Sequence, residues 1–188
     1  MKYTITILLT FFYTLVDAQT NFGFTDVTII NKKGDSVTCL IKIEINYGDI
    51  ITYKDYQDAP EKKMDSKNIR SIRFPFKYLE NITVDNREKL ATLIVQGKIN
   101  LYNYVELKNG ETVDVPKSGG VKFTPSKTVV HYIIKAGSEY KDLEENSFPG
   151  NLKPFVNDCL ELNNKIDSQV FSFADMATII KDYNTCKQ

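Results

Sequence analysis

The stretch VTCLIKIEIN, residues 37–46, decides the fold class because apolar and polar side chains alternate along it. In a β-strand, successive side chains point to opposite faces, so this alternation gives one apolar face and one mostly polar face. The apolar face carries Val37, Cys39, Ile41, Ile43 and Ile45, and the other face carries Thr38, Lys42, Glu44 and Asn46. The pattern is typical of an antiparallel sheet that packs on one side and faces water on the other.

Turn signals flank this strand on both sides. Residues 26–31 form a short apolar run, and Lys32-Lys33-Gly34-Asp35 separates that run from the alternating strand. On the other side, Tyr47-Gly48-Asp49 leads into the apolar segment 50–53. Glycine and aspartate favour tight turns between strands. The sequence therefore predicts a three-stranded meander, followed by a polar loop over residues 58–67.

The next region gives a strand and an ambiguous apolar segment. Residues 68–74 predict a strand, which Pro75 ends. Asp85 to Glu88 has the pattern of a helix capping box, and Gly97 stands where a C-terminal cap would lie. We therefore expect a helix with an apolar stripe, and a buried strand over residues 91–95 is the alternative. The stripe would comprise Leu90, Leu93 and Ile94.

Three further segments continue the β pattern. Residues 99–107 alternate, and Asn109-Gly110 is the strongest hairpin dipeptide of the chain. We expect a return strand over residues 111–115 and a loop over residues 116–125, where Gly119-Gly120 lacks the pattern of a phosphate-binding loop. Residues 128–135 are apolar on both faces, which indicates an interior strand.

After Gly137 the apolar spacing becomes helical. It recurs at Leu152, Phe155, Val156, Cys159, Leu162 and Ile166, and again at Met176, Ile179, Ile180 and Tyr183. Pro154 falls in a first helical turn, where proline is tolerated, and Ser172 with Asp175 forms a capping box. Strands followed by helices predict an α+β fold, with a mainly antiparallel sheet or meander and a C-terminal helical pair. We expect a β-rich region over 19–145 and a helical subdomain over 146–188 that packs on the sheet as one domain.

The first 18 residues have the features of a cleavable signal peptide. Lys2 precedes an apolar run over residues 5–16, and a small-residue cleavage site lies between Ala18 and Gln19. The run is shorter than the ~20 residues of a transmembrane helix, although a membrane anchor or a buried helix is the alternative reading. We expect an exported protein, periplasmic or secreted, with no membrane span after signal removal.

Charge and composition restrict the partners. The chain has 24 basic and 24 acidic residues, a formal net charge of zero, and no basic cluster. Nucleic-acid binding proteins concentrate positive charge on one face, so we expect no nucleic-acid partner.

The three cysteines divide into one buried thiol and one pair. Cys39 lies on the apolar face of its strand, where a cysteine acts as a small hydrophobic side chain. Cys159 and Cys186 remain for a disulfide bond in an oxidising compartment. A simple helical hairpin would place them at different heights, so the bridge requires a break in the first helix near Asp158 or an extended tail after Tyr183. No C-x-x-C motif suggests thiol exchange or zinc binding.

The sequence contains no set of residues that predicts catalysis, a metal site or a cofactor. His131 is the only histidine, and its position within an apolar strand favours a packed, hydrogen-bonded side chain over a catalytic one. Asp26, Asp49 and Asp55 lie near the ends of predicted strands, where aspartates are common turn residues.

Tyrosines give a weak indication of function. Exposed tyrosines can form a contact surface for a protein or glycan of the cell envelope. The candidates are Tyr47, Tyr53, Tyr56, Tyr102 and Tyr104. Our leading hypothesis is a non-enzymatic interaction module that uses this surface or the loop 116–125. The alternatives are a hydrolase of envelope or extracellular polymers, which would act through carboxylates or His131, and a carrier of a small ligand.

Several motifs resemble a small group of uncharacterised exported bacterial proteins in which a β-rich region precedes a cysteine-containing helical tail. The similar residues lie at 34–45, 95–102, 155–159 and 183–186, with Leu162, Ile166, Phe173, Ile179 and Ile180 between the last two segments. The resemblance implies export, this order of regions and a pairing of Cys159 with Cys186. It implies no activity.

Overall fold

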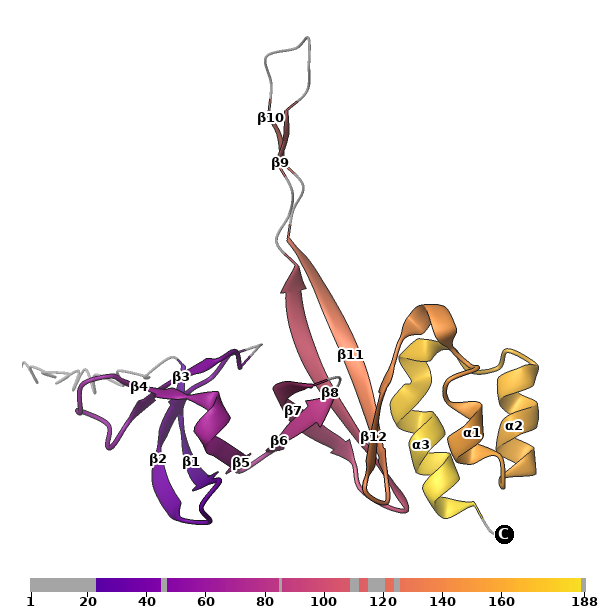
Figure 1. Cartoon of the computed structure of the whole chain (residues 1–188), viewed down its shortest axis with the longest axis horizontal. Coiled ribbons are helices and arrows are strands. Elements are labelled where there is room, and N and C mark those ends of the chain that lie inside the picture. Colours follow the sequence, from indigo (N-terminus) through magenta and orange to yellow (C-terminus); the bar gives the residue numbers. More distant parts are fainter. Residues whose placement is uncertain are drawn as a thin grey trace, which may run out of the picture.

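The computed structural model describes residues 23–44, 47–84, 86–108, 112–114, 121–123 and 126–186. Its main element is a ten-stranded antiparallel sheet with the order β12-β11-β8-β7-β6-β5-β1-β2-β3-β4. Helices follow the last strand, so the α+β prediction is confirmed. Figure 1 shows β1 to β4 at one end of the molecule and the helices at the other, with β5 and β6 between them.

Most neighbours in the sheet are also neighbours in sequence, as expected of a meander. The strands are β1 (Phe24–Asn31), β2 (Ser36–Lys42), β3 (Ile50–Lys54), β4 (Lys62–Asp65), β5 (Ile69–Arg73), β6 (Tyr78–Val84), β7 (Arg87–Val95), β8 (Ile99–Lys108), β11 (Lys127–Ala136) and β12 (Glu139–Leu143). A separate pair, β9 (Thr112–Asp114) and β10 (Val121–Phe123), lies beyond the ends of β8 and β11 (Figure 1).

The helical region begins after β12. Its elements are the 3-10 turns η2 (Glu145–Ser147) and η3 (Phe173–Asp175) and the helices α1 (Lys153–Val156), α2 (Leu160–Asp167) and α3 (Met176–Thr185); a further 3-10 turn, η1 (Ser66–Asn68), follows β4. Pro154 lies in the first turn of α1, and Ser172 and Asp175 form the predicted capping box. Among the described residues, no helix is long and apolar enough to cross a membrane.

Among the described residues, three clusters of buried side chains hold the sheet together. One lies within β1 to β7 and includes Cys39 and Ile41, which confirms the predicted burial of this part of the alternating strand. A second joins β7, β8, β11 and β12 to the helices. The third lies on the opposite face of these strands, around Tyr102 and Ile133. Val37 and Ile43, which the alternation places on the same face as Cys39 and Ile41, are exposed, and Ile45 and Asn46 lie outside the described residues.

The predicted helix over residues 85–97 is wrong, because this segment is the strand β7 and matches the alternative reading. Val84 pairs with Arg87, and Asn86 adopts the left-handed conformation (φ 62°) that asparagine tolerates in tight turns. Leu90 and Ala91 are both buried although they point to opposite faces of the strand. A strand that is buried on both faces lacks alternation and can imitate a helical pattern.

Other local predictions also need correction. The polar loop predicted over 58–67 contains β4, an edge strand that pairs with β3 although only Met64 gives it an apolar side chain. The strand β6 was not predicted. A return strand occurs as β9, but it pairs with β10, while β8 pairs with β7 and β11. Asn109, Gly110 and most of the predicted loop 116–125 lie outside the described residues, as do Ala18 and Gln19.

Candidate functional site

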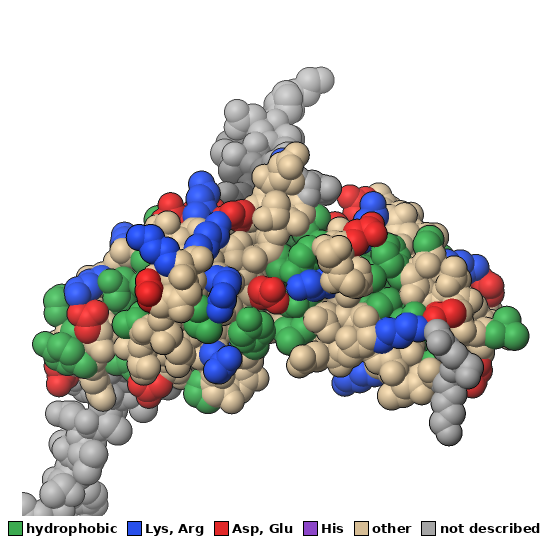
Figure 2. All heavy atoms as spheres, turned by 60° about the horizontal axis from the view of Figure 1, so that its bottom comes forward, with side chains coloured by type: hydrophobic (Ala, Val, Ile, Leu, Met, Phe, Trp, Pro, Cys, Tyr) green, Lys and Arg blue, Asp and Glu red, His purple; other side chains and the backbone are tan. Residues whose placement is uncertain are grey.

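The most promising site is a groove of about 620 Å³ that runs between the β5–β6 hairpin and the strands β8 and β11. Figure 2 shows the molecule from the side that lies at the bottom of Figure 1, where its surface is notched between the two halves. The side chains that line the groove are Arg73, Phe74, Phe76, Lys77, Tyr78, Glu80, Leu93, Gln96, Asn100, Tyr102 and Lys135.

The sheet register explains why residues so distant in sequence meet here. Arg73 pairs with Tyr78 across the hairpin, and Asn100 pairs with Lys135 between β8 and β11. Because side chains alternate between faces, Tyr78 and Glu80 lie on one face of β6, and Asn100 and Tyr102 lie on one face of β8. The groove therefore combines polar side chains from four strands with Gln96 from the turn between β7 and β8.

Glu80 is the only carboxylate among the described residues that line the groove, and its charge is compensated. The Tyr102 hydroxyl donates to Glu80 Oε2 at 2.7 Å, and the Tyr140 hydroxyl donates to Oε1 at 3.4 Å. Lys135 Nζ lies 3.8 Å from Oε1 and 4.8 Å from the centroid of the Tyr140 ring. Burial, with Glu80 next to it, raises the pKa of Tyr102 above its usual value. The Glu80 carboxylate therefore accepts hydrogen bonds from side chains of the protein itself and is held in a fixed position.

The turn between β5 and β6 places a lysine among aromatic rings. Lys77 Nζ lies 4.6 Å from the centroid of Phe74, 4.8 Å from that of Tyr47 and 5.9 Å from that of Phe76. Burial lowers the pKa of Lys77. Phe76 remains 66% exposed, and its ring centroid lies 5.8 Å from that of Phe74. The result is an exposed aromatic ring at the rim, backed by a second ring and a cation.

Arg73 differs from the other charged residues of the groove. It is exposed, and its guanidinium makes no hydrogen bond or ion pair with any described residue. Lys135 faces Glu80, whereas Arg73 has no such acceptor. An arginine presents several donors in a rigid plane that suits carboxylates and phosphates. Arg73 is therefore available to an external acceptor.

The β7–β8 turn with Gln96, and the start of β8 with Asn100, are held by contacts with the helical region. Asn100 Oδ1 accepts a hydrogen bond from the Gly97 backbone at 3.0 Å. The amide of Asn184, in α3, exchanges two hydrogen bonds with the backbone of Ile99. Lys98 forms an ion pair with Asp158 at 2.6 Å and lies 4.8 Å from the centroid of Tyr183. This side of the groove is consequently held in place before any ligand arrives.

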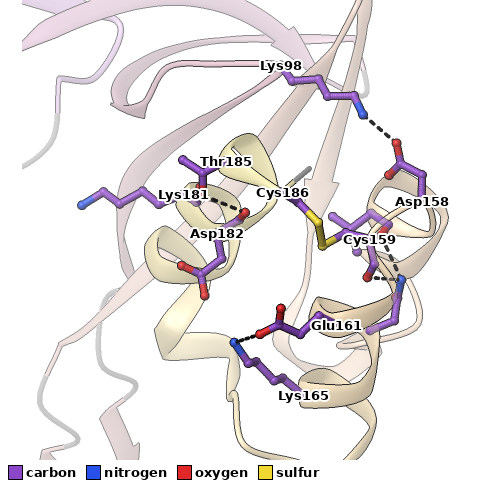
Figure 3. Close-up of a disulfide and its surroundings, with 11 residues drawn as sticks. Lys98, Asp158, Cys159, Glu161, Lys165, Lys181, Asp182, Thr185 and Cys186 are labelled. Carbon is purple, nitrogen blue, oxygen red and sulfur yellow. Dashed lines mark hydrogen bonds and ion pairs between the residues drawn. A yellow bond between two sulfur atoms is a disulfide. The ribbon is translucent and has the colours of Figure 1, made fainter. Parts of the chain in front are cut away.

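The predicted disulfide is present beside this turn. Cys159 and Cys186 are bonded, with their Cα atoms 6.2 Å apart, and Figure 3 shows the bridge between the N-terminus of α2 and the end of α3. The first predicted helix breaks between α1 and α2, which is one of the two ways in which the sequence allowed this pairing. Asn163 stabilises the break, since its amide donates to the carbonyls of Val156 and Cys159.

A second hollow, of about 640 Å³, lies between α2 and α3 next to the disulfide. It is the weaker candidate because charged side chains of its lining pair with each other, as Lys165 does with Glu161 (Figure 3). Within the described residues, no group of three or more His, Cys, Asp or Glu side chains is arranged to hold a metal ion.

The predicted tyrosine surface is not one continuous surface. Tyr47 and Tyr102 are only 9% and 1% exposed. Tyr53 and Tyr104 are half-buried, and Tyr56 is 64% exposed in the segment between β3 and β4. Tyr47 and Tyr102 are therefore structural, and a contact role for the other three stays a prediction. Tyr102 nevertheless lies at the groove through its bond to Glu80.

His131 has the packed, hydrogen-bonded environment that the sequence predicts. Its ring stacks on Tyr104 with a centroid distance of 4.5 Å, and its Nε2 lies 3.1 Å from Glu106 Oε2. Burial, with Asp142 and Glu106 nearby, raises the pKa of Tyr104 to about 12. His131 does not line the groove, so the structure does not bring it together with Glu80.

Comparison with known proteins gives no relative from which a function could be transferred. No family model, no curated protein and no solved structure matches the chain.

Sequence reasoning missed the residues that make the groove distinctive. Arg73, Phe76 and Glu80 belong to a predicted strand end, a turn and an unpredicted strand, and no spacing in the sequence connects them. The signals that were available are local: an aromatic residue on each side of Pro75, followed by a lysine. That pattern indicates a turn with large exposed side chains, but it gives no hint of the facing strand.

Proposed function

We propose that this chain is a non-enzymatic binding module that works outside the cytoplasm and holds its ligand or partner in the groove between the β5–β6 hairpin and β8. The observation that carries the proposal is the availability of Arg73 and Phe76. A guanidinium that has no acceptor among the described residues and an aromatic ring that is 66% exposed face solvent at one site. Arginine is among the side chains that most often dominate binding energy, and phenylalanine is enriched at binding interfaces.

The rest of the groove supports binding by being ordered in advance. Glu80 is held by Tyr102, Tyr140 and Lys135, and the turn with Gln96 and Asn100 is held by Asn184. A site that is fixed before binding loses less conformational entropy when the ligand arrives. This rigidity favours recognition of a defined ligand.

Two observations favour a binding role over hydrolysis. Glu80 is committed to donors of the protein itself, and it is the only carboxylate among the described lining residues, whereas glycosidases use two. His131 lies outside the groove.

The alternative of a small-ligand carrier would need a cavity between the sheet and the helices. It is disfavoured because side chains from β8, β11 and the helices form a packed core there.

The extracytoplasmic location rests on the sequence of residues 1–18 together with the disulfide. Disulfide bonds persist in oxidising compartments and are rare in reducing ones. N-terminal sequencing of protein from the culture medium and the periplasm tests this part of the proposal. A chain that begins at Gln19 supports it, and a chain in the cytosol that retains Met1 contradicts it.

Site-directed photo-crosslinking tests the groove itself. A photoreactive phenylalanine analogue replaces Phe76, Tyr56 or Val170 in turn, because these three side chains have nearly equal exposure, at 66%, 64% and 64%. The full chain is expressed with its own leader in its native host and irradiated in intact cells. We expect a defined adduct from position 76 that Arg73→Gln removes and Arg70→Gln preserves. Arg70 is the matched control because it is an exposed arginine of β5 that does not line the groove.

The other outcomes overturn the proposal in different ways. An adduct from position 56 alone would transfer the contact to the tyrosine-bearing segment between β3 and β4. Adducts of equal yield from all three positions would indicate non-specific proximity. The absence of an adduct at position 76 would remove the groove as the binding site.

A further inference from the structure

The lining of the groove has a surplus of positive charge that the zero net charge of the chain conceals. Arg73, Lys77 and Lys135 line it together with one carboxylate, Glu80. Lys135 faces Glu80, which leaves the charges of Arg73 and Lys77 without a carboxylate among the described residues. In a concave site with protein on both sides, such charges attract an anion more strongly than they do on a flat surface. The electrostatics therefore favour a negatively charged ligand.

The rim adds features that suit a sugar ring. Phe76 presents an exposed ring, and the C–H face of a pyranose is apolar enough to stack on an aromatic surface. Gln96 is exposed. Asn100 accepts from the Gly97 backbone and donates to Tyr102, which leaves one of its two amide N–H groups, so both amides can reach hydroxyl groups. Amide side chains supply both donors and acceptors, as pairing with hydroxyls requires.

The topology argues against a peptide as the occupant. β5, β6, β8 and β11 line the groove, and each of them already has a neighbour on both sides in the sheet. A peptide that binds to a sheet gains most of its affinity by adding a strand to a free edge. The edges of this sheet are β4 and β12, which do not line the groove. Recognition here has to come from side chains, which is the usual mode for saccharides.

We propose that the groove binds a carboxylate-bearing saccharide, with the carboxylate on Arg73, a sugar face on Phe76 and hydroxyls at Gln96 and Asn100. This inference rests on the proposed function, because it names the ligand class of the same groove. Lys77 adds long-range attraction to the carboxylate, while Glu80 stays bonded to Tyr102 and Tyr140.

Calorimetric titration of the oxidised chain with uronate trisaccharides tests the inference. The probes are trigalacturonate and trimannuronate, with the methyl ester of trigalacturonate as the uncharged counterpart and triglutamate as the acidic peptide. We expect at least one uronate to bind, and its methyl ester to bind at least about ten-fold more weakly, as the loss of one charge-assisted hydrogen bond implies. Binding should weaken with added salt.

Variants locate the site. Arg73→Gln should lower the affinity for the uronate about ten-fold or more without changing the affinity for the methyl ester. Phe76→Ala should lower the affinity for both the uronate and its methyl ester, because both stack on the same ring. Arg70→Gln should change neither. A thermal melt of each variant that coincides with that of the wild type shows that the fold is intact.

Three results would overturn the inference and leave the proposed function standing: equal binding of acid and ester, binding of triglutamate in place of the saccharides, or no binding of any probe while the crosslink from position 76 persists. If no probe binds and position 76 gives no crosslink, the inference and the proposed function fail together.

Discussion

The side-chain amide of Asn184 in α3 pairs with both backbone hydrogen-bonding groups of Ile99 in β8. Asn184 Nδ2 donates to the Ile99 carbonyl at 2.9 Å, and the Ile99 N–H donates to Asn184 Oδ1 at 2.8 Å. The amide thus satisfies the two backbone groups of Ile99, the first residue of β8, which a neighbouring strand would otherwise bond. It joins the helical region to the start of β8, next to the groove residues Gln96 and Asn100, so helix docking and groove geometry depend on one side chain.

Asn184→Ala should destabilise the protein by about 1–3 kcal/mol, because both polar groups of the Ile99 backbone lose their partner. Urea unfolding of the oxidised chain measures the effect. Asn157→Ala is the matched control, since Asn157 is exposed and its side chain has no hydrogen bond to a described residue. Equal stability of the two variants would show that the amide pairing contributes nothing.

Gly97→Ala should be destabilising for a related reason. A Cβ at residue 97 would lie 2.9 Å from the Cβ of Asn184 and closer still to its amide, so the asparagine would have to leave its place. The cost of Gly97→Ala should therefore shrink when Asn184 is already alanine. A double-mutant cycle in urea measures this coupling, which we expect to be about 1 kcal/mol or more for residues in direct contact. Additive effects would contradict the steric explanation.

Replacement of Cys159 and Cys186 by serine should lower the free energy of unfolding by about 3–4 kcal/mol, since the bridge closes a loop with a sequence separation of 27. Denaturant unfolding of this double variant, compared with the wild type with and without reductant, measures the loss. Reductant should shift the unfolding midpoint of the wild type and leave that of the double variant unchanged. A wild-type midpoint that is insensitive to reductant would mean that the bridge does not stabilise the fold.

The fold could be predicted where the signal is local. The alternation around Cys39 predicted a strand and a buried thiol, and the Ser172–Asp175 pair predicted a helix start. The disulfide was predictable because the compartment rule left one simple pair of cysteines. The geometric mismatch of that pair predicted either a helix break near Asp158 or an extended tail, and the structure has the break. In each case the prediction needs no knowledge of how distant strands align.

The groove could not be predicted, because its residues are brought together by the register between strands. The groove forms only if β5, β6, β8 and β11 align so that Arg73, Glu80 and Lys135 converge. The sequence of any one strand does not determine this alignment. The helix prediction around Leu90 was wrong for the same reason, since the burial of both faces of this strand comes from partners far away in sequence. The exposure of the tyrosines could not be predicted either, because it is a property of the assembled sheet: Tyr102 is 1% exposed and Tyr56 is 64% exposed.

Cys39 should be unreactive in the folded protein. Its side chain is 2% exposed, and burial together with the nearby Asp55 raises the pKa of the thiol to about 11. Alkylation with iodoacetamide at pH 8 should be slow in buffer and fast in denaturant, with mass spectrometry as the readout. Rapid labelling of the native protein would contradict the burial. Because the folded pKa is the higher one, the thiol's contribution to stability is complete below pH 9 and is lost as the pH rises toward 11.

The bond between Tyr102 and Glu80 should limit stability in alkali. Burial and the Glu80 carboxylate raise the pKa of Tyr102 above the usual value of 10.0, so the folded state retains a proton that the unfolded chain releases. The contribution of Tyr102 is therefore complete below pH 10 and decreases as the pH rises beyond it. Urea midpoints measured between pH 8 and pH 11 should fall more steeply for the wild type than for Tyr102→Phe, which cannot ionise.

At pH 8, Tyr102→Phe should cost about 1–3 kcal/mol, because Glu80 loses its shortest hydrogen bond in a half-buried position. Tyr140→Phe is the internal comparison and should cost less, since its hydroxyl lies 3.4 Å from the carboxylate. If both variants kept wild-type stability and the same alkaline slope, Glu80 would not depend on these donors. Glu80 would then be free to act in the groove as a base, and the argument against hydrolysis would lose its main support.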